Sequence, residues 1–234
     1  WNISTTTKVN MEKKIVCSLA TWPPRIKYVM TCITSLLNQT VVPDLIMINC
    51  SKLEFPNGVA DFPEELQRLI SEHENVQAIF EDQNIGPFRK EIIPAYQLYG
   101  KSYILFTADD DYNYAPEYIE TMLKKLGNYD YYCSEKSVCG GRYCIRGELF
   151  LPMFWNRLNM DIVNTGLNDT WLDAYLRMIS ARGLCDSDDN LRAMIHKTPN
   201  AETDSPNSER VGGYTAELVN RAIRNSIIAL TKWR

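Results

Sequence analysis

The sequence predicts an α/β protein built on a doubly wound, mostly parallel sheet, with a smaller antiparallel part in its second half. Apolar runs alternate with helical segments up to residue 108, and this alternation weakens after residue 127. An acidic triplet, Asp109–Asp111, directly follows the fourth apolar run. Alternating strands and helices favour parallel strands joined by crossover helices. Ligands of such sheets bind at the carboxyl ends of the strands.

The first expected elements are a strand and an amphipathic helix. The run KKIVCSLATW is apolar up to Thr21 and is closed by Pro23 and Pro24, which is typical of a buried strand that enters a loop. In RIKYVMTCITSLLNQ (25–39), apolar residues recur at helical spacing. The chain therefore begins its fold with a strand-to-helix unit.

Three more strands and two more helices are expected before the triplet. Strands are predicted over DLIMINC (44–50), VQAIFED (76–82) and SYILFTA (102–108). A helix opened by a proline is predicted over 63–73. The segment 88–100 predicts a helix that is interrupted or begun around Pro94 and ends at Gly100. The ends of these strands place Ser51 and Asp82 on the same edge as the triplet.

The second half is less regular. Helices are expected over PEYIETMLKKL (116–126) and TWLDAYLRMISARG (170–183), and one or two antiparallel strands between residues 129 and 155. The segment 197–213 has the composition of a loop. It is either a plain surface loop or, by hypothesis, a segment that closes over a bound ligand.

Composition excludes some classes of protein. A net charge of −4 with no basic run argues against a nucleic-acid partner. No apolar window approaches the length of a membrane span, and no signal peptide is evident, so a soluble, cytoplasmic protein is expected. The spacing of the seven cysteines lacks the paired CxxC of zinc sites, which favours reduced thiols in the core.

The acidic triplet needs a partner. Adjacent carboxylates raise one another's pKa unless a cation neutralises them, and oxygen ligands suit Mg²⁺ or Mn²⁺. The alternative is a group of acids at a helix N-terminus, because Asp111 shortly precedes a helix that Pro116 can open. A metal site better explains why three acidic residues directly follow an apolar strand.

Four segments carry a resemblance to a known family. They are SLATWPPRI, SLLNQT, GPFRKEIIPAYQLYGKSYILFTADDDYNYAPEYI and NDTWLDAYL. In this order they resemble the nucleotide-sugar glycosyltransferases of the GT-A (Rossmann-like) fold, especially bacterial family-2-like enzymes that build capsule and lipopolysaccharide glycans. The resemblance spans residues 15 to about 180 of the chain. It implies transfer of a sugar from a nucleoside diphosphate, most often UDP, to an acceptor hydroxyl.

The resemblance also implies how the chain is divided. An N-terminal extension (1–14) would precede one GT-A domain (15–234), with a nucleotide-binding half (15–115) and an acceptor-side half (116–234). The acceptor would be a glycan or a lipid-linked glycan. Peripheral association with the inner face of the membrane is compatible with such an acceptor.

Roles for the donor site follow from the same resemblance. Asp111 and Asp109 become metal ligands, with Asp111 the direct one, and Asp110 meets the ribose or a metal-bound water. A metal at this position stabilises the charge that develops on the leaving diphosphate. The other residues expected to bind the donor are Thr21, Pro23, Arg25, Ser51, Asp82 and Lys90.

Roles on the acceptor side are less direct. The family often has Asp-Asp-x-Trp where this chain has Asn168-Asp169-Thr170-Trp171. Asp169 keeps the position of the general base of an inverting transfer, although it or Asn168 could also cap a helix. Trp171 either stacks on an acceptor sugar or packs in the core. His196 is either a late metal ligand or a structural histidine.

The sequence is also compatible with two other functions. A nucleotidyltransferase would carry a glycine-rich phosphate loop after its first strand, and LATWPPRI contains no glycine. A non-catalytic nucleotide-sugar or carbohydrate-binding module would keep the fold without turnover. Substrate turnover distinguishes this module from an enzyme.

Overall fold

The computed structural model describes residues 13–135, 142–156, 168–199, 201 and 225. The predicted segment 197–213 therefore lies largely outside the described residues, as do the extension up to residue 12 and Cys139.

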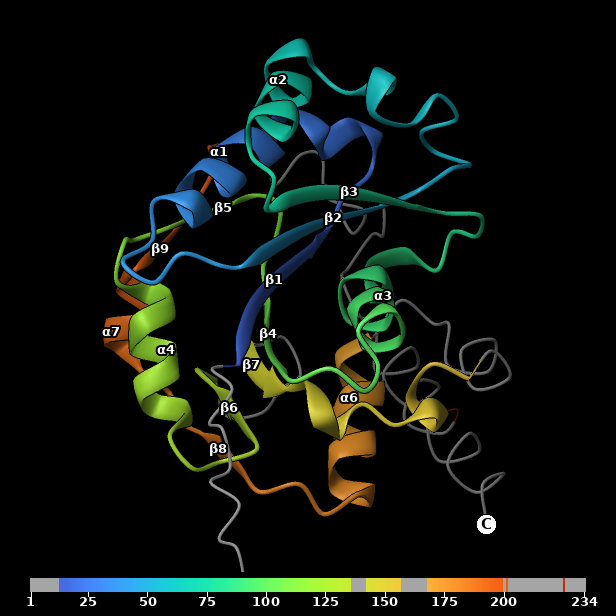
Figure 1. Ribbon diagram of the computed structural model, residues 1–234. Coiled ribbons are helices and arrows are strands. Elements are labelled where there is room, and N and C mark those ends of the chain that lie inside the picture. Colours follow the sequence, from blue (N-terminus) through green and yellow to red (C-terminus); the bar gives the residue numbers. More distant parts are fainter. Residues whose placement is uncertain (1–12, 136–141, 157–167, 200, 202–224, 226–234) are drawn as a thin grey trace, which may run out of the picture.

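The centre of the molecule is a seven-stranded sheet with the order β3-β2-β1-β4-β7-β6-β8 (Figure 1). Its strands are β1 (Lys14–Ala20), β2 (Leu45–Ser51), β3 (Val76–Glu81), β4 (Tyr103–Thr107), β6 (Tyr131–Cys133), β7 (Tyr143–Arg146) and β8 (Gly183–Cys185). The first four strands are parallel, whereas β7 runs antiparallel to both β4 and β6. A second, two-stranded antiparallel sheet joins β5 (Tyr112–Tyr114) to β9 (Ile195–Lys197). The predicted mostly parallel sheet with a smaller antiparallel part is confirmed.

Helices cover both faces of the sheet. They are α1 (Ile26–Leu37), α2 (Glu64–Glu72), α3 (Arg89–Gln97), α4 (Tyr118–Leu126), α6 (Asn168–Met178) and α7 (Asp189–Ala193). Figure 1 shows α1, α2 and α4 on one face and α3 and α6 on the other. The fold is therefore doubly wound.

Strand residues alternate between two apolar cores. Leu19, Ile48 and Phe106 pack with α1, α2 and α4, whereas Val16 and Met47 pack with α3 and α6. Burial on both faces explains why these strands are continuously apolar rather than alternating. Each such side chain contributes about 1.5–3 kcal/mol when it is fully buried.

Helix α3 corrects one expectation. Pro94 neither begins nor interrupts it, but lies inside it. A proline removes one backbone hydrogen bond from a helix. Here Pro94 is buried, and its carbonyl also accepts a hydrogen bond from the hydroxyl of Tyr103 on β4 at 3.3 Å.

The described cysteines are free thiols, as predicted. Five of them are buried and Cys185 is partly buried. Burial raises the pKa of the Cys50 thiol to about 12, with a nearby Arg89 acting in the opposite direction. The Cys50 thiol therefore remains protonated at neutral pH.

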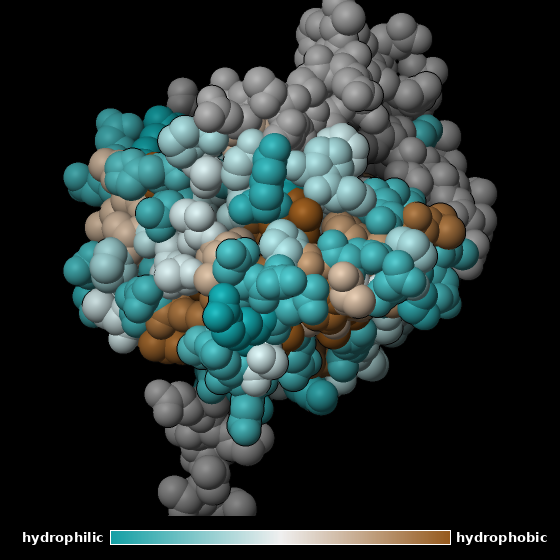
Figure 2. All heavy atoms as spheres, turned by 90° about the horizontal axis from the view of Figure 1, so that it is seen from above, coloured by the Kyte–Doolittle hydropathy of each residue, from teal (hydrophilic) through white to brown (hydrophobic). Residues whose placement is uncertain are grey.

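The surface is predominantly hydrophilic on the face that Figure 2 shows, with apolar residues in small separate patches. Among the helices that the structure describes, none combines the length and apolar character needed to cross a bilayer.

Candidate functional site

The candidate site lies where the strand order of the sheet reverses. Strands β2 and β3 extend the sheet from one side of β1, whereas β4 extends it from the other. The carboxyl ends of β1 and β4 therefore meet at a topological switch point, which is where open α/β sheets bind ligands. The turn Pro23–Arg25 follows β1, and the triplet Asp109–Asp111 follows β4.

Hydrogen bonds to the backbone of the triplet hold it in place. The Asp109 N–H donates to the Tyr114 hydroxyl at 2.9 Å, and the Cys32 thiol donates to the Asp109 carbonyl at 3.4 Å. The Asp111 carbonyl accepts a hydrogen bond from Thr198 N–H at 2.7 Å, directly after β9. Helix α4 begins only at Tyr118, so the triplet does not cap it, and the helix-terminus alternative is excluded.

Side-chain cations surround the three carboxylates. Nη2 of Arg25 lies 2.5 Å from Asp110 Oδ1 and also contacts Asp111 Oδ1. Nζ of Lys90, on α3, donates to Asp109 Oδ1 at 3.0 Å. Nζ of Lys197, on β9, lies 3.9 Å from Asp111 Oδ2. Three elements that are distant in sequence therefore neutralise the triplet together.

The pKa values of the carboxyls differ within the triplet. Burial raises the pKa of Asp110 to about 7, although Arg25 and Thr21 act in the opposite direction. Burial likewise raises the pKa of Asp111, again with Arg25 opposing it. For Asp109, burial is outweighed by Lys90 and Arg142, and the pKa is lowered. The charged forms of Asp110 and Asp111 are therefore less stable here than in water, despite the contact of both carboxyls with Arg25.

Arg89 connects the loops at this edge, and sequence reasoning missed it. Its side chain is only 3% exposed. One guanidinium nitrogen donates to the Thr21 carbonyl at 2.8 Å, and the other donates to Glu54 Oε2 and Asn84 Oδ1. The loops after β1, β2 and β3 are thus tied to α3. The available signal was a pair of cations at the start of an otherwise apolar segment, FRKEIIPA.

The structure brings together most of the residues predicted to bind the donor. Thr21, Arg25 and Lys90 lie at the triplet, and the exposed Pro23 opens the turn that carries Arg25.

The other two predicted donor residues do not contact the triplet in the interactions of the described residues. Ser51 is fully buried, and its hydroxyl accepts a hydrogen bond from the Leu53 N–H at 3.2 Å, so it shapes the turn after β2. Asp82 is exposed and pairs with Lys52 at 2.7 Å.

The acceptor-side predictions have different outcomes. Trp171 is fully buried against Phe154 and Tyr175, so the structure places it in the core rather than at a sugar-binding surface. Its burial explains why this position is aromatic without any role in stacking on an acceptor. Asp169 lies in the first turn of α6, and its side chain is outside what the structure describes.

His196 is not brought to the triplet. It is exposed and pairs with Asn113 between β9 and β5. Neighbouring residues of a strand point to opposite faces, and the next residue, Lys197, is the one that reaches Asp111. The histidine therefore faces away from the carboxylates.

The carboxylate oxygens of the triplet are suitable ligands for a hard divalent ion. Within the described part of the chain, no group of three or more His, Cys, Asp or Glu side chains could hold a metal ion by itself. Mg²⁺ and Mn²⁺ sites, however, often use one or two carboxylates completed by waters and substrate phosphates. One oxygen from Asp110 and one from Asp111 converge on the same nitrogen of Arg25. Two convergent carboxylate oxygens are a suitable donor pair for such an ion.

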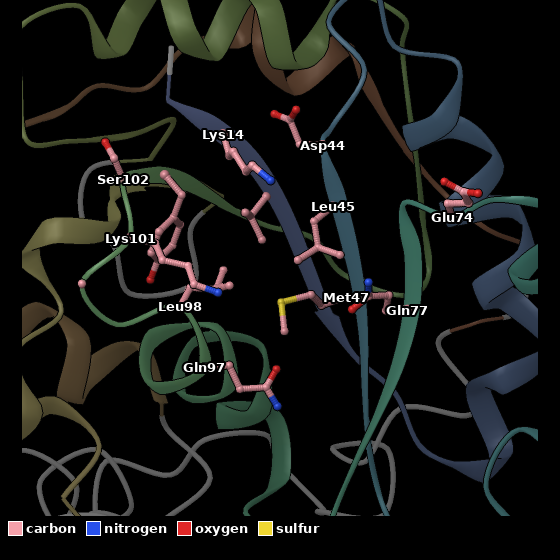
Figure 3. Close-up of a pocket in the computed structure, with 13 residues that line it drawn as sticks. Lys14, Asp44, Leu45, Met47, Glu74, Gln77, Gln97, Leu98, Lys101 and Ser102 are labelled. Atoms are coloured by element: carbon pink, nitrogen blue, oxygen red, sulfur yellow. The ribbon is translucent and has the colours of Figure 1, made fainter. Parts of the chain in front are cut away.

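A cavity of about 830 Å³ lies at the opposite edge of the sheet (Figure 3). It is lined by residues at the amino ends of the parallel strands, including Lys14, Leu45 and Gln77, and by Gln97 and Leu98 at the end of α3. None of the predicted site residues lines it.

Comparisons with known proteins give distant structural neighbours only. No family model matches the chain, and no curated protein matches its sequence. Solved structures similar in architecture include residues 1–349 of TarS from S. aureus in complex with UDP, with a TM-score of 0.48 and 12% identity over 75% of this chain and 58% of that chain. A second structure of TarS, in complex with UDP-GlcNAc, has a TM-score of 0.47 and 12% identity over 76% of this chain and 56% of that one. The chain thus spans little more than half the length of these TarS chains.

Proposed function

We propose that the chain is a glycosyltransferase of the GT-A type, which moves a sugar from a nucleoside diphosphate sugar to an acceptor hydroxyl. The observation that carries the proposal is the buried acidic pair Asp110 and Asp111, placed at the switch point of the sheet and bridged by Arg25. The resemblance of four ordered segments to this family supports the same assignment.

The donor diphosphate would bind beside the triplet. Asp111, with its neighbours Asp109 and Asp110, would hold Mn²⁺ or Mg²⁺. The ion, when bound, supplies positive charge that stabilises the leaving diphosphate. Lys90 pairs with Asp109 and Arg25 with Asp110 and Asp111, so both cations would be available to diphosphate oxygens that meet the ion. Fixed cations at the leaving group lower the barrier because their orientation is established before the reaction.

The acceptor would be activated by Asp169. Asp169 is a carboxylate at the start of α6 that would accept the proton of the attacking hydroxyl, and a single base without a nucleophile would correspond to an inverting transfer. We assign the reaction to synthesis of a bacterial surface polysaccharide on a glycan or lipid-linked glycan at the inner face of the membrane. In this scheme residues 15–115 bind the nucleotide and 116–234 the acceptor.

A thermal-shift screen of nucleotides and nucleotide sugars, with and without Mn²⁺, tests donor binding. A ligand that binds only the folded protein raises the melting temperature, by an amount that grows with its concentration relative to Kd. We expect UDP-sugars with Mn²⁺ to give the largest shift. No shift with any donor would contradict the proposal, whereas donor binding without turnover of any acceptor would favour a non-catalytic binding module.

A further inference from the structure

The contact between Arg25 and the acidic pair has an unusual geometry. A single nitrogen, Nη2, contacts one oxygen of Asp110 and one oxygen of Asp111. A cation bridging two carboxylates would occupy the same point between the two oxygens. The guanidinium and a divalent ion therefore compete for one position.

Because this position is buried, leaving the two carboxylates without a cation there would raise the free energy of the folded protein. The side chains of Asp110 and Asp111 are only 4% and 6% exposed, and that of Arg25 is 13% exposed. Removing one partner from a buried ion pair strongly destabilises the charge that remains. An ion that displaced Arg25 without giving it a new partner would leave a largely buried guanidinium without a counter-charge. The divalent ion alone is thus expected to bind weakly.

The guanidinium has unused capacity to bind an anion. Its Nε is buried and has no hydrogen-bond partner in the part of the chain that the structure describes. A guanidinium presents its donors in a planar fork that matches phosphate oxygens with two parallel hydrogen bonds. A diphosphate at this edge would give Arg25 the partner that it loses when it leaves the carboxylates.

Two other cations near the triplet, Lys90 and Lys197, do not occupy the bridging position. Lys90 contacts Asp109, outside the bridged pair, and Lys197 lies 3.9 Å from the other oxygen of Asp111. Neither of these contacts lies between the two converging oxygens. Arg25 is therefore the cation whose removal exposes the bridging position.

We propose that Arg25 is an exchangeable counter-ion, which occupies the cation position of the acidic pair until a divalent ion and a nucleoside diphosphate bind together. This inference rests on the proposed function and adds its regulation to it. Arg25 then turns from the carboxylates to the diphosphate. Because coupling between two ligands is reciprocal, the nucleotide strengthens metal binding by the same factor as the metal strengthens nucleotide binding.

Mn²⁺ binding measured by EPR, from the loss of the free-ion signal, tests the exchange without reference to turnover. The full chain is compared with Arg25→Gln, each with and without UDP. In the absence of UDP, we expect Arg25→Gln to bind Mn²⁺ about tenfold more tightly than the wild-type chain does. UDP is expected to tighten Mn²⁺ binding strongly in the wild type and much less in the variant. Equal Mn²⁺ affinities of the two chains without UDP would overturn the exchange.

Two further variants keep the test decisive. Lys27→Gln removes an exposed cation two positions from Arg25 and is expected to bind Mn²⁺ as the wild type does. Arg25→Lys keeps the charge, but its side chain is shorter and its ammonium group is smaller than a guanidinium. The ammonium should therefore fill the bridging position less well, and the variant is expected to bind Mn²⁺ alone more tightly than the wild type. If Arg25→Gln fails to fold, as judged by circular dichroism, Arg25→Lys decides, and an affinity equal to that of the wild type overturns the exchange.

The exchange and the proposed function can fail separately. The comparison without UDP concerns the exchange alone. Failure of the wild-type chain to bind UDP or any UDP-sugar, with or without Mn²⁺, would instead contradict the proposed function.

Discussion

The two edges of the central sheet differ in what their side chains can do. The carboxyl edge gathers buried charges, with Asp109–Asp111 paired to Arg25 and Lys90. The amino edge has the cavity of about 830 Å³, with an apolar floor that includes Leu45 and Met47 and with Lys14, Asp44 and Glu74 among its polar lining residues (Figure 3).

The cavity and the cluster of buried charged side chains therefore lie at different edges of the sheet. At the carboxyl edge, cations of the chain itself lie against the carboxylates, and we propose that a ligand displaces one of them. At the amino edge, the volume is within the range of ligand pockets, but its described lining includes none of the clustered, buried charges seen at the other edge. The triplet is therefore the better guide to function.

The largest effect is expected from Asp111→Ala. Loss of the proposed direct metal ligand should lower turnover of the donor by about a thousandfold, the upper range for a group that stabilises transition-state charge. Release of UDP from a UDP-sugar measures this. Asp189→Ala, which removes a carboxylate that is 93% exposed, is the control and should leave turnover unchanged. Unchanged turnover in Asp111→Ala would remove the metal assignment from the carboxyl edge.

A large effect on stability is expected from Arg89→Met. The variant leaves Glu54 without its buried partner and releases the loops after β1 and β3, so the free energy of unfolding should fall by about 3–5 kcal/mol. Urea denaturation measures the loss. Arg68→Met on α2 removes an exposed guanidinium and should change the free energy of unfolding by less than about 0.5 kcal/mol. A similar small change in both variants would show that Arg89 does not hold this edge together.

A smaller effect is expected from Lys90→Met. Loss of one cation at the proposed diphosphate position should weaken UDP binding about tenfold, which corresponds to about 1.4 kcal/mol. Isothermal titration calorimetry in the presence of Mn²⁺ measures the Kd. Lys124→Met on α4, whose side chain is 71% exposed, should bind UDP as the wild type does. Wild-type affinity in Lys90→Met would place the diphosphate away from α3.

The smallest effect is expected at the amino edge. Gln77→Trp puts a bulky side chain into the cavity from an exposed strand position, where aromatic residues are well tolerated. Donor turnover should stay within about twofold of the wild type, the range of an ordinary surface substitution. A tenfold fall with the fold intact would mean that the cavity takes part in the reaction, and the contrast between the two edges would fail.

The sequence predicted the strands of the parallel sheet and the position of the triplet, because both depend on local pattern. Four apolar runs bounded by turn residues correspond to β1–β4, and the rule for carboxyl ends places Asp109–Asp111 beside the loop after β1. Pro94 was misjudged, because packing against β4 maintains a helix that local propensity disfavours.

The partners of the triplet could not be predicted in the same way. Arg25 and Lys197 reach Asp111 from opposite ends of the described chain, and nothing in the local pattern pairs them. The orientation of His196 depends on the register of β9 against β5, which a strand of three residues does not reveal in its sequence. Arg89 was missed because one of its acceptors is a backbone carbonyl, which any residue type provides.

In the proposed enzyme, a divalent ion and a nucleoside diphosphate complete the acidic triplet at the carboxyl edge. Anomalous diffraction from crystals grown with UDP and Mn²⁺ tests it most directly. We expect a manganese peak about 2.1 Å from a carboxylate oxygen of Asp111, with the diphosphate beside it and Arg25 turned toward the phosphates. UDP bound in the amino-edge cavity, or a triplet that Arg25 still bridges without manganese, would contradict it.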